Sequence, residues 1–219
     1  QYNLINFIHT YEGTSPIKHP VGMTSIYPSG QNLDLENSPA DWISPNGDVA
    51  QRPPTTGGKV VLADNDHLCG ICDDFLFPWR SFLAGENPLF MDPYDSINSS
   101  IGDDILTNLY DPCNPNWNRM RNNLGYTRAL ATAMDLSVMV PHGELTSTGI
   151  CLANPGVEYI VLSPATASLS VDLTGSAKSY SVTWLNPADS FSVVGSPVTG
   201  GATRVFTSPF GAPAVLHLK

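Results

Sequence analysis

Charged side chains are scarce in this sequence, and basic ones are the scarcest. Lys and Arg number 10 of 219 residues against 20 Asp and Glu, so the formal net charge is -10. A surface of that sign repels phosphate backbones, and we therefore expect no nucleic-acid partner. Charged residues make up only 14% of the chain, while Asn, Ser, Thr, Gly and Pro are plentiful. This balance is typical of a secreted, loop-rich protein.

Long hydrophobic runs are also missing. No apolar segment approaches the roughly 20 residues that a membrane span requires, and no charged n-region with an apolar h-region opens the chain. We expect no membrane span. The sequence opens on QYNLINFIHTYEG, an amphipathic helix with no capping residue before it, which indicates further sequence upstream. The expected location is secreted or periplasmic, with the signal peptide outside this sequence.

Cysteine is too infrequent for a disulfide scaffold and too scattered for a two-pair zinc site. Cys69 and Cys72 have the spacing of a redox pair at the start of an expected helix, where the helix N-terminus would lower a thiol pKa. The aromatic-Cys-Gly-Pro-Cys context of thioredoxin-type sites is absent, so packed or disulfide-linked thiols are favoured. The cysteine pairing stays open, and we expect no metal and no cofactor.

Residues 1–143 alternate apolar helices with short apolar strands. Periodicity predicts helices over 1–13, 72–86 and 116–135, a helical turn over 32–37, and strands over 19–26, 40–45, 59–64 and 88–92. Strands that alternate with helices in this way are typical of a parallel α/β sheet.

The pattern changes at residue 144. Short β-rich runs such as GVEYIVLSP, SYSVTWLNP and APAVLHLK follow one another, separated by Gly, Pro, Ser and Asn turns. Such spacing is typical of an antiparallel β-sandwich. We therefore expect two domains, an α/β domain over 1–143 and a β-sandwich over 144–219.

Carboxylates accompany the ends of two expected strands. Asp64 ends the strand over 59–64, Asp66 and His67 follow it, and Asp92 ends the next strand. Catalytic groups in parallel sheets gather at the carboxyl ends of the strands. Paired carboxylates there suit glycoside hydrolysis, with one as nucleophile or base and another as acid. The alternative is that the aspartates cap a helix or turn and that His67 is a structural hydrogen-bonding residue.

Aromatic residues supply candidate sugar-binding groups, because an indole ring packs on the C–H face of a sugar. Trp42 is the better candidate, since Trp79 lies on the apolar stripe of a helix and is expected in the core. Asp41 precedes Trp42, and a functional role at a strand end and a capping role both remain open for it. We expect Tyr159 and Trp184 in the core of the β-rich region.

Several segments together resemble a known family. HPVGMT, SPADWISPNG, VVLADNDHLCG, FPWRSFLAGENPLFMDPYD, NLGYTRALATAMDL and GELTSTGICLANPGVEYIVLSP are similar, in this order, to the C-terminal half of bacterial apiosidase-like glycoside hydrolases. In that family a (β/α)8 TIM-type barrel is followed by a small β-sandwich that often carries a collagen-binding label. The resemblance implies a fold of class α/β plus all-β, with barrel strands five to eight in residues 1–143.

The same resemblance implies a site. Asp64 and Asp66 fall at the end of strand seven, where related barrels hold the nucleophile, and His67, Trp42, Asp41 and Asp92 become substrate-binding candidates. The acid/base glutamate of such barrels closes strand four, which this sequence does not contain. Related enzymes usually use Glu as nucleophile, so an aspartate here would shift the reacting oxygen by one C–C bond.

Two functions are compatible with these features. The first is a polysaccharide- or oligosaccharide-degrading glycoside hydrolase, inactive as this chain alone. The second is a non-catalytic carbohydrate-binding or structural surface protein, favoured by the absent acid/base residue and by Asn65 between the two aspartates. In either case the expected ligand is a carbohydrate. The expected protein partner is the first half of the barrel or a second copy of this chain.

Overall fold

The computed structural model describes residues 1–25, 30–46, 58–64, 74–90 and 115–219. The chain divides into two compact units. The first comprises Gln1–Cys72 and Glu86–Met91, and the second comprises Asp73–Gly85 and Asp92–Lys219. This division differs from the predicted boundary after residue 143, because two helices of the expected α/β domain lie in the second unit.

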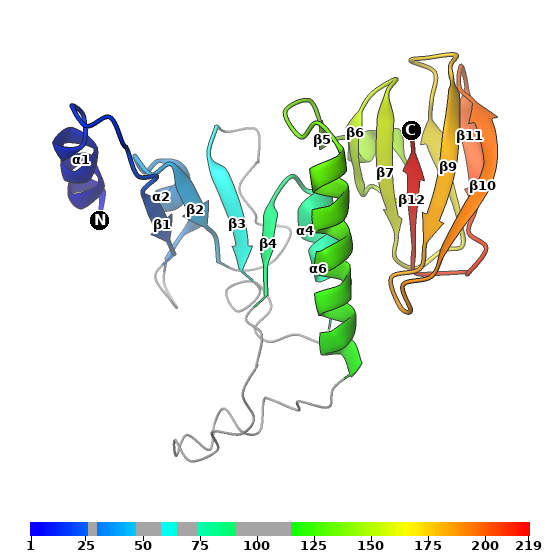
Figure 1. Cartoon of the computed structure of the whole chain (residues 1–219), viewed down its shortest axis with the longest axis horizontal. Coiled ribbons are helices and arrows are strands. Elements are labelled where there is room, and N and C mark those ends of the chain that lie inside the picture. The colour runs from blue at the N-terminus through cyan, green and yellow to red at the C-terminus, as the bar shows by residue number, and fades with distance from the viewer. Residues whose placement is uncertain (26–29, 47–57, 65–73, 91–114) are drawn as a thin grey trace. The chain divides into compact units, whose positions relative to one another are not determined.

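The first unit is built on a parallel sheet of four short strands (Figure 1). They are β1 (Gly22–Thr24), β2 (Trp42–Ser44), β3 (Val60–Asp64) and β4 (Asn87–Leu89), in that spatial order. Every neighbouring pair is parallel. The expected parallel α/β sheet is confirmed for these strands, and its assignment to half of a barrel stays a prediction.

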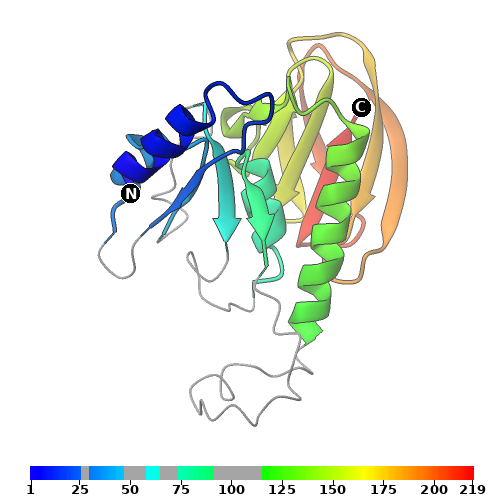
Figure 2. The ribbon, with the colours of Figure 1, turned by 60° about the vertical axis from the view of Figure 1, so that its left-hand side comes forward.

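Two helices contribute the core of the first unit. Helix α1 (Tyr2–Tyr11) supplies Ile5, and the short helix α2 (Asn32–Glu36) supplies Leu35. These side chains pack against Ile43 and Val61, which are 1% and 2% exposed. The helices therefore lie against one face of the parallel sheet (Figure 2).

The second unit contains two helices and two antiparallel sheets. Helix α4 spans Phe77–Leu83 and helix α6 spans Pro115–Ala133. The larger sheet has the order β10-β9-β12-β7-β6-β5 and the smaller has the order β11-β8. The strands are β5 (Val140–Pro141), β6 (Cys151–Asn154), β7 (Glu158–Ser163), β8 (Ser168–Asp172), β9 (Ser179–Leu185), β10 (Ser192–Thr199), β11 (Thr203–Thr207) and β12 (Ala214–Leu218). A single 3-10 turn, η2 (Gly143–Leu145), follows β5.

The six-stranded sheet is covered on both faces. One face shares a core with the two-stranded sheet, and this core includes Tyr159 and Trp184, as expected from the sequence. The other face packs against α4 and α6, where Trp79 is fully buried beside Leu162. The all-β character of the region after residue 144 is confirmed, while its assignment to a β-sandwich stays a prediction.

Three details differ from the sequence predictions. The helix expected over 72–86 is shorter, because within the described residues it begins at Phe77, with Pro78 in its first turn. Strands β5 and β6 were not predicted. The apolar stripes of α4 and α6 were predicted correctly, but they cover the six-stranded antiparallel sheet. Periodicity shows that a helix face is buried without showing which sheet buries it.

Candidate functional site

Asp64 is the last residue of β3 and lies at the carboxyl edge of the parallel sheet. It pairs in register with Leu89 of β4. Alternation along β3 buries Val61 and Ala63 and leaves Val60, Leu62 and Asp64 on the opposite face. The carboxylate therefore belongs to the sheet face away from α1 and α2, and its side chain is partly buried.

Asp64 is also distinctive among the strand ends that the structure describes. The other described strands of the parallel sheet end in Thr24, Ser44 and Leu89, so Asp64 is the one acidic residue that ends a described strand of this sheet. The other candidates around it, Asp66, His67 and Asp92, lie outside the described residues. Their predicted roles stay predictions.

Asp41 and Trp42 lie at the other edge of the same sheet. Trp42 is the first residue of β2 and pairs with Gly22 and Val60, the first residues of their strands. Val60 and Asp64 are four residues apart, which corresponds to about 13 Å at the usual rise of a strand. The structure therefore places Trp42 and Asp64 on one face but at opposite ends, and it does not bring them together.

The Asp41 carboxylate contacts both His9 of α1 and Val21, the residue just before β1. Its Oδ2 accepts a hydrogen bond of 2.8 Å from the backbone N–H of Val21 and lies 3.0 Å from His9 Nε2. The Val21 hydrogen bond, followed by the hydrogen bond and charge of His9, lowers the pKa of Asp41 below its ordinary value. Of the two roles left open by the sequence, this geometry fits the structural one.

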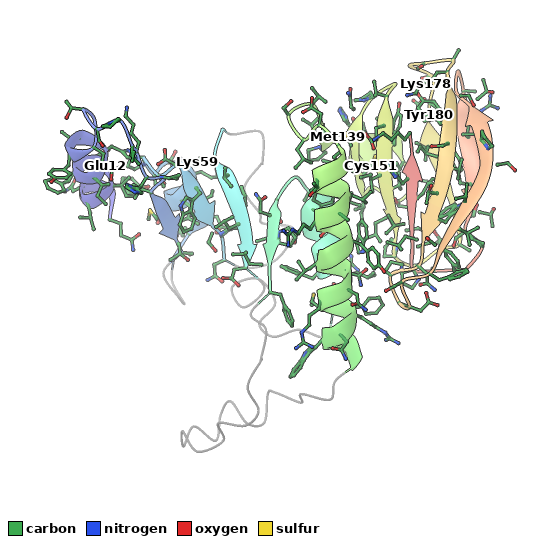
Figure 3. All side chains as sticks on the ribbon, viewed as in Figure 1. Glu12, Lys59, Met139, Cys151, Lys178 and Tyr180 are labelled. Carbon is green, nitrogen blue, oxygen red and sulfur yellow. The ribbon has the colours of Figure 1, made fainter. Side chains whose placement is uncertain are left out.

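A second imidazole–carboxylate pair closes the loop after α1. Glu12 accepts a 2.8 Å hydrogen bond from the backbone N–H of His19 and lies 2.6 Å from His19 Nδ1. These bonds to the backbone and side chain of His19 lower the pKa of Glu12. Figure 3 shows Glu12 at the end of α1 and Lys59 just before β3. The Lys59 ammonium donates to the carbonyl oxygens of Ser38 and Ala40, both at 2.7 Å.

A cavity of about 860 Å³ lies at this amino edge. Its walls are formed by His9, Glu12, Lys18, His19, Pro20, Asp41, Trp42, Val60 and Leu62. The indole of Trp42 lies over Gly22, because a Cβ built on Gly22 would fall 1.9 Å from Trp42 Cε2. Sequence reasoning identified Asp41 and Trp42 but missed His9, Glu12 and His19. His9 and Asp41 are 32 positions apart, and no local pattern indicates their contact.

Metal and thiol chemistry find no support in the described residues. No group of three His, Cys, Asp or Glu side chains there is arranged to hold a metal ion. Cys151 is free and buried, and burial raises its thiol pKa to about 12, so it is a poor nucleophile near neutral pH. Cys69, Cys72 and Cys113 lie outside the described residues. No described helix is long and apolar enough to cross a membrane.

Comparison with known proteins gives a fold but no family. No family model matches the sequence, and no curated protein matches it. Solved structures of glycoside hydrolases do match, so the chain has a glycoside hydrolase-like fold.

One match is a glycoside hydrolase family 5 structure from Bacteroides vulgatus ATCC 8482. It aligns with 73% of this chain at 14% identity, with a TM-score of 0.51. Another, described as a glycoside hydrolase, aligns with 99% of this chain at 14% identity and a TM-score of 0.46. The chain spans 41% and 46% of these two proteins, respectively, which is less than half of either.

Proposed function

We propose that this chain is part of a glycoside hydrolase that cleaves O-glycosyl bonds in a polysaccharide or oligosaccharide. The observation that carries the proposal is the position of Asp64 at the carboxyl end of a parallel strand in a glycoside hydrolase-like fold. Carboxyl ends of parallel strands are where enzymes of such folds place catalytic groups. The apiosidase-like family, the half-barrel and the β-sandwich are finer parts of the same proposal.

Asp64 or Asp66 is the proposed nucleophile. In a retaining mechanism the carboxylate attacks the anomeric carbon and forms a glycosyl–enzyme ester, while a second carboxylic acid protonates the leaving oxygen. The two carboxyl groups then stand about 5–5.5 Å apart. In the apiosidase-like barrels that this chain resembles, the acid/base glutamate closes strand four, and we therefore propose that the acid/base is not one of the residues 1–219. Residues 1–219 alone are then inactive.

The nature of the substrate also bears on location. Extracellular polysaccharides are too large to enter a cell intact, and the chain is poor in charge and rich in Asn, Ser, Thr, Gly and Pro, a balance typical of secreted proteins. We therefore propose a secreted or periplasmic protein.

The test uses the natural polypeptide with the coding sequence that surrounds these residues. Aryl glycosides and a panel of polysaccharides are assayed with the parent protein and with Asp64→Asn and Asp66→Asn made separately. The nucleophile variant is expected to lose activity by about 10³-fold or more. Azide added to the corresponding Asp→Ala variant should restore turnover of the aryl glycoside and give a glycosyl azide product, because the small anion can attack the anomeric carbon from the space that the carboxylate has left.

Two outcomes decide against this assignment. Activity retained in both single variants removes both aspartates from the nucleophile role. Tight glycan binding by the parent protein without turnover supports the alternative, a non-catalytic carbohydrate-binding protein on the same scaffold.

A further inference from the structure

The chain beyond β2 is held in an extended conformation by a side chain of α2. Asn46, two residues after the end of β2, donates its backbone N–H to Asn32 Oδ1 at 3.0 Å, and Asn32 Nδ2 donates to the Asn46 carbonyl oxygen at 2.9 Å. A residue that bonds one partner through both its N–H and its C=O is extended, as in the paired residues of an antiparallel sheet. The strand geometry of β2 therefore continues to Asn46.

Asn46 belongs to the same sheet face as Asp64. Ile43 packs in the core of the first unit and Pro45 is buried, so the alternation of a strand turns Asn46 to the opposite face. In β3, Val61 lies in the same core and Asp64 is on the opposite face. Both side chains therefore lie on the sheet face away from α1 and α2.

The register between β2 and β3 brings these two residues together at the carboxyl edge. The strands are parallel neighbours, and Ile43 is paired with Val61 (Figure 1). Three residues further along each strand, the same register pairs Asn46 with Asp64. Neighbouring strands lie about 4.8 Å apart, and Asn and Asp side chains have the same length. A carboxamide and a carboxylate thus stand side by side at equal height above the sheet.

The clamp from Asn32 uses only backbone atoms of Asn46. It would hold an alanine at this position equally well, so it does not account for a carboxamide beside Asp64. A carboxamide carries two N–H donors and an acceptor oxygen, which suits a sugar hydroxyl because a hydroxyl both donates and accepts. A role in sugar binding does account for it.

We infer that Asn46 binds the sugar ring that Asp64 attacks, through the hydroxyl group on the carbon next to the anomeric carbon. This inference rests on the proposed function and deepens it by naming the substrate class, glycosides with a free hydroxyl at that carbon. Hydrogen bonds to this hydroxyl strengthen in the transition state of glycoside hydrolysis, so Asn46 contributes to catalysis and not to ground-state binding alone. Asn32 is a positioning residue, because it fixes the backbone from which the carboxamide extends.

Kinetics with two substrates test the role of Asn46 in the natural polypeptide used for the nucleophile variants. The ratio kcat/KM is measured for an aryl glycoside and for its 2-deoxy analogue. Asn46→Ala should lower kcat/KM by about 10²-fold for the aryl glycoside. For the 2-deoxy analogue it should change kcat/KM by less than about twofold, because the hydroxyl that the amide binds is absent. A merely structural role would lower both values alike.

Two further variants complete the test. Asn32→Ala removes the clamp and should lower kcat/KM by about tenfold for the aryl glycoside, with little effect on the 2-deoxy analogue, because the carboxamide is no longer held in place. Asn37→Ala is the matched control, since Asn37 is an exposed residue at the other end of α2. It should leave both values unchanged.

The outcomes separate the role of Asn46 from the hydrolase itself. Equal losses with the two substrates, or no loss in Asn46→Ala, overturn the inference and leave the hydrolase standing. Activity retained in Asp64→Asn also overturns it, because the nucleophile then lies elsewhere. A parent polypeptide without turnover overturns the proposed function and the inference with it.

NMR tests the placement of Asn46 without any turnover. In residues 1–219, Asp64→Asn should shift the side-chain amide signals of Asn46, because a charge about 5 Å away is removed. These signals are identified by their loss in Asn46→Ala. The signals of Asn123 in the second unit are the control and should stay in place. Unmoved Asn46 signals overturn the inference even where the polypeptide is an active hydrolase.

Discussion

The indole of Trp42 occupies the space where a side chain on Gly22 would stand. The two residues are paired in adjacent parallel strands, and a Cβ on Gly22 would lie within 2.3 Å of three indole atoms. Glycine is therefore required at position 22 by a close approach and not by its backbone angles. Trp42 was predicted from sequence as a candidate sugar platform, and the structure adds that its ring lies over the backbone of β1.

Replacing Gly22 tests this packing. Gly22→Ala should displace the Trp42 indole, because the new methyl group and the ring cannot occupy the same space and the backbone of Gly22 is held in the sheet. The first unit should lose about 1–3 kcal/mol of stability. Urea unfolding followed by tryptophan fluorescence measures the effect. The matched control is Gly125→Ala in α6, where a new Cβ meets nothing within 4 Å. That control should be neutral or gain about 0.5–1 kcal/mol from helix propensity. Unchanged stability and fluorescence in Gly22→Ala would contradict the close contact.

The Asp41 carboxylate predicts a pH dependence for the first unit. Its pKa is lowered from an ordinary value of 3.8, chiefly by the Val21 hydrogen bond and then by His9. A lowered folded-state pKa gives stability that is present above the unfolded value and is lost as the pH falls through the folded value. The first unit should therefore weaken below about pH 4.

Asp41→Asn separates this titration from the hydrogen bond itself, because the amide oxygen can still accept from Val21. The variant should be less stable than the parent at pH 7 and should weaken less as the pH falls from 5 to 2. NMR signals of the buried residues Ile43 and Val61 report the transition. Asp135→Asn serves as control, since its pKa is lowered by Ser137 in the second unit. A parent-like acid transition in Asp41→Asn would show that other groups control it.

At the scale of elements, one buried amide joins α4, α6 and the turn after β9. Asn123 of α6 is 1% exposed. Its Oδ1 accepts a 2.7 Å hydrogen bond from Trp79 Nε1, and its Nδ2 donates to the Pro187 carbonyl at 3.0 Å. Lys219 adds a weaker link from the chain's last residue to the end of α6, at 3.4 Å from the Ala133 carbonyl. The helices are therefore fixed to the six-stranded sheet by specific polar bonds as well as by apolar packing.

Asn123→Ala should destabilise the second unit by about 2–4 kcal/mol, because it leaves the Trp79 N–H and the Pro187 carbonyl buried without their partner. Asn122→Ala, at the exposed neighbouring position, is the control and should change stability by less than about 0.5 kcal/mol. Thermal unfolding measures both. Similar values for the two variants would show that apolar packing alone holds α4 and α6 in place.

The elements themselves were largely predictable, and their partners were not. The alternation in VVLAD and the helical period around Trp79 and Met120 are local signals, and each gave a correct element. Strand β6, Cys151–Asn154, is four residues long between turn residues and offers too short a pattern. The apolar stripe of α6 predicts that one face of the helix is buried, but it does not identify the sheet against which that face packs. The pairs around the cavity join residues far apart in sequence, so only the fold brings them together.

For the whole molecule, the cores of the two units differ greatly in size. In the described part of the chain, the first unit has one cluster of five buried apolar residues: Ile5, Leu35, Ala40, Ile43 and Val61. The second unit has two clusters of fourteen and nine. Hydrophobic burial is the main favourable term in folding, so the first unit is expected to be the less stable one.

The four tryptophans make this difference measurable, because Trp42 lies in the first unit and Trp79, Trp117 and Trp184 lie in the second. Residues 1–219 should unfold in urea in two steps, the first at lower urea and the second with most of the fluorescence change. Trp42→Phe should remove the fluorescence amplitude of the first step while circular dichroism still records it. Trp184→Phe, the matched control, should reduce only the second step. A single transition with coincident fluorescence and circular dichroism would contradict this expectation, because it would show that the small core unfolds together with the large ones.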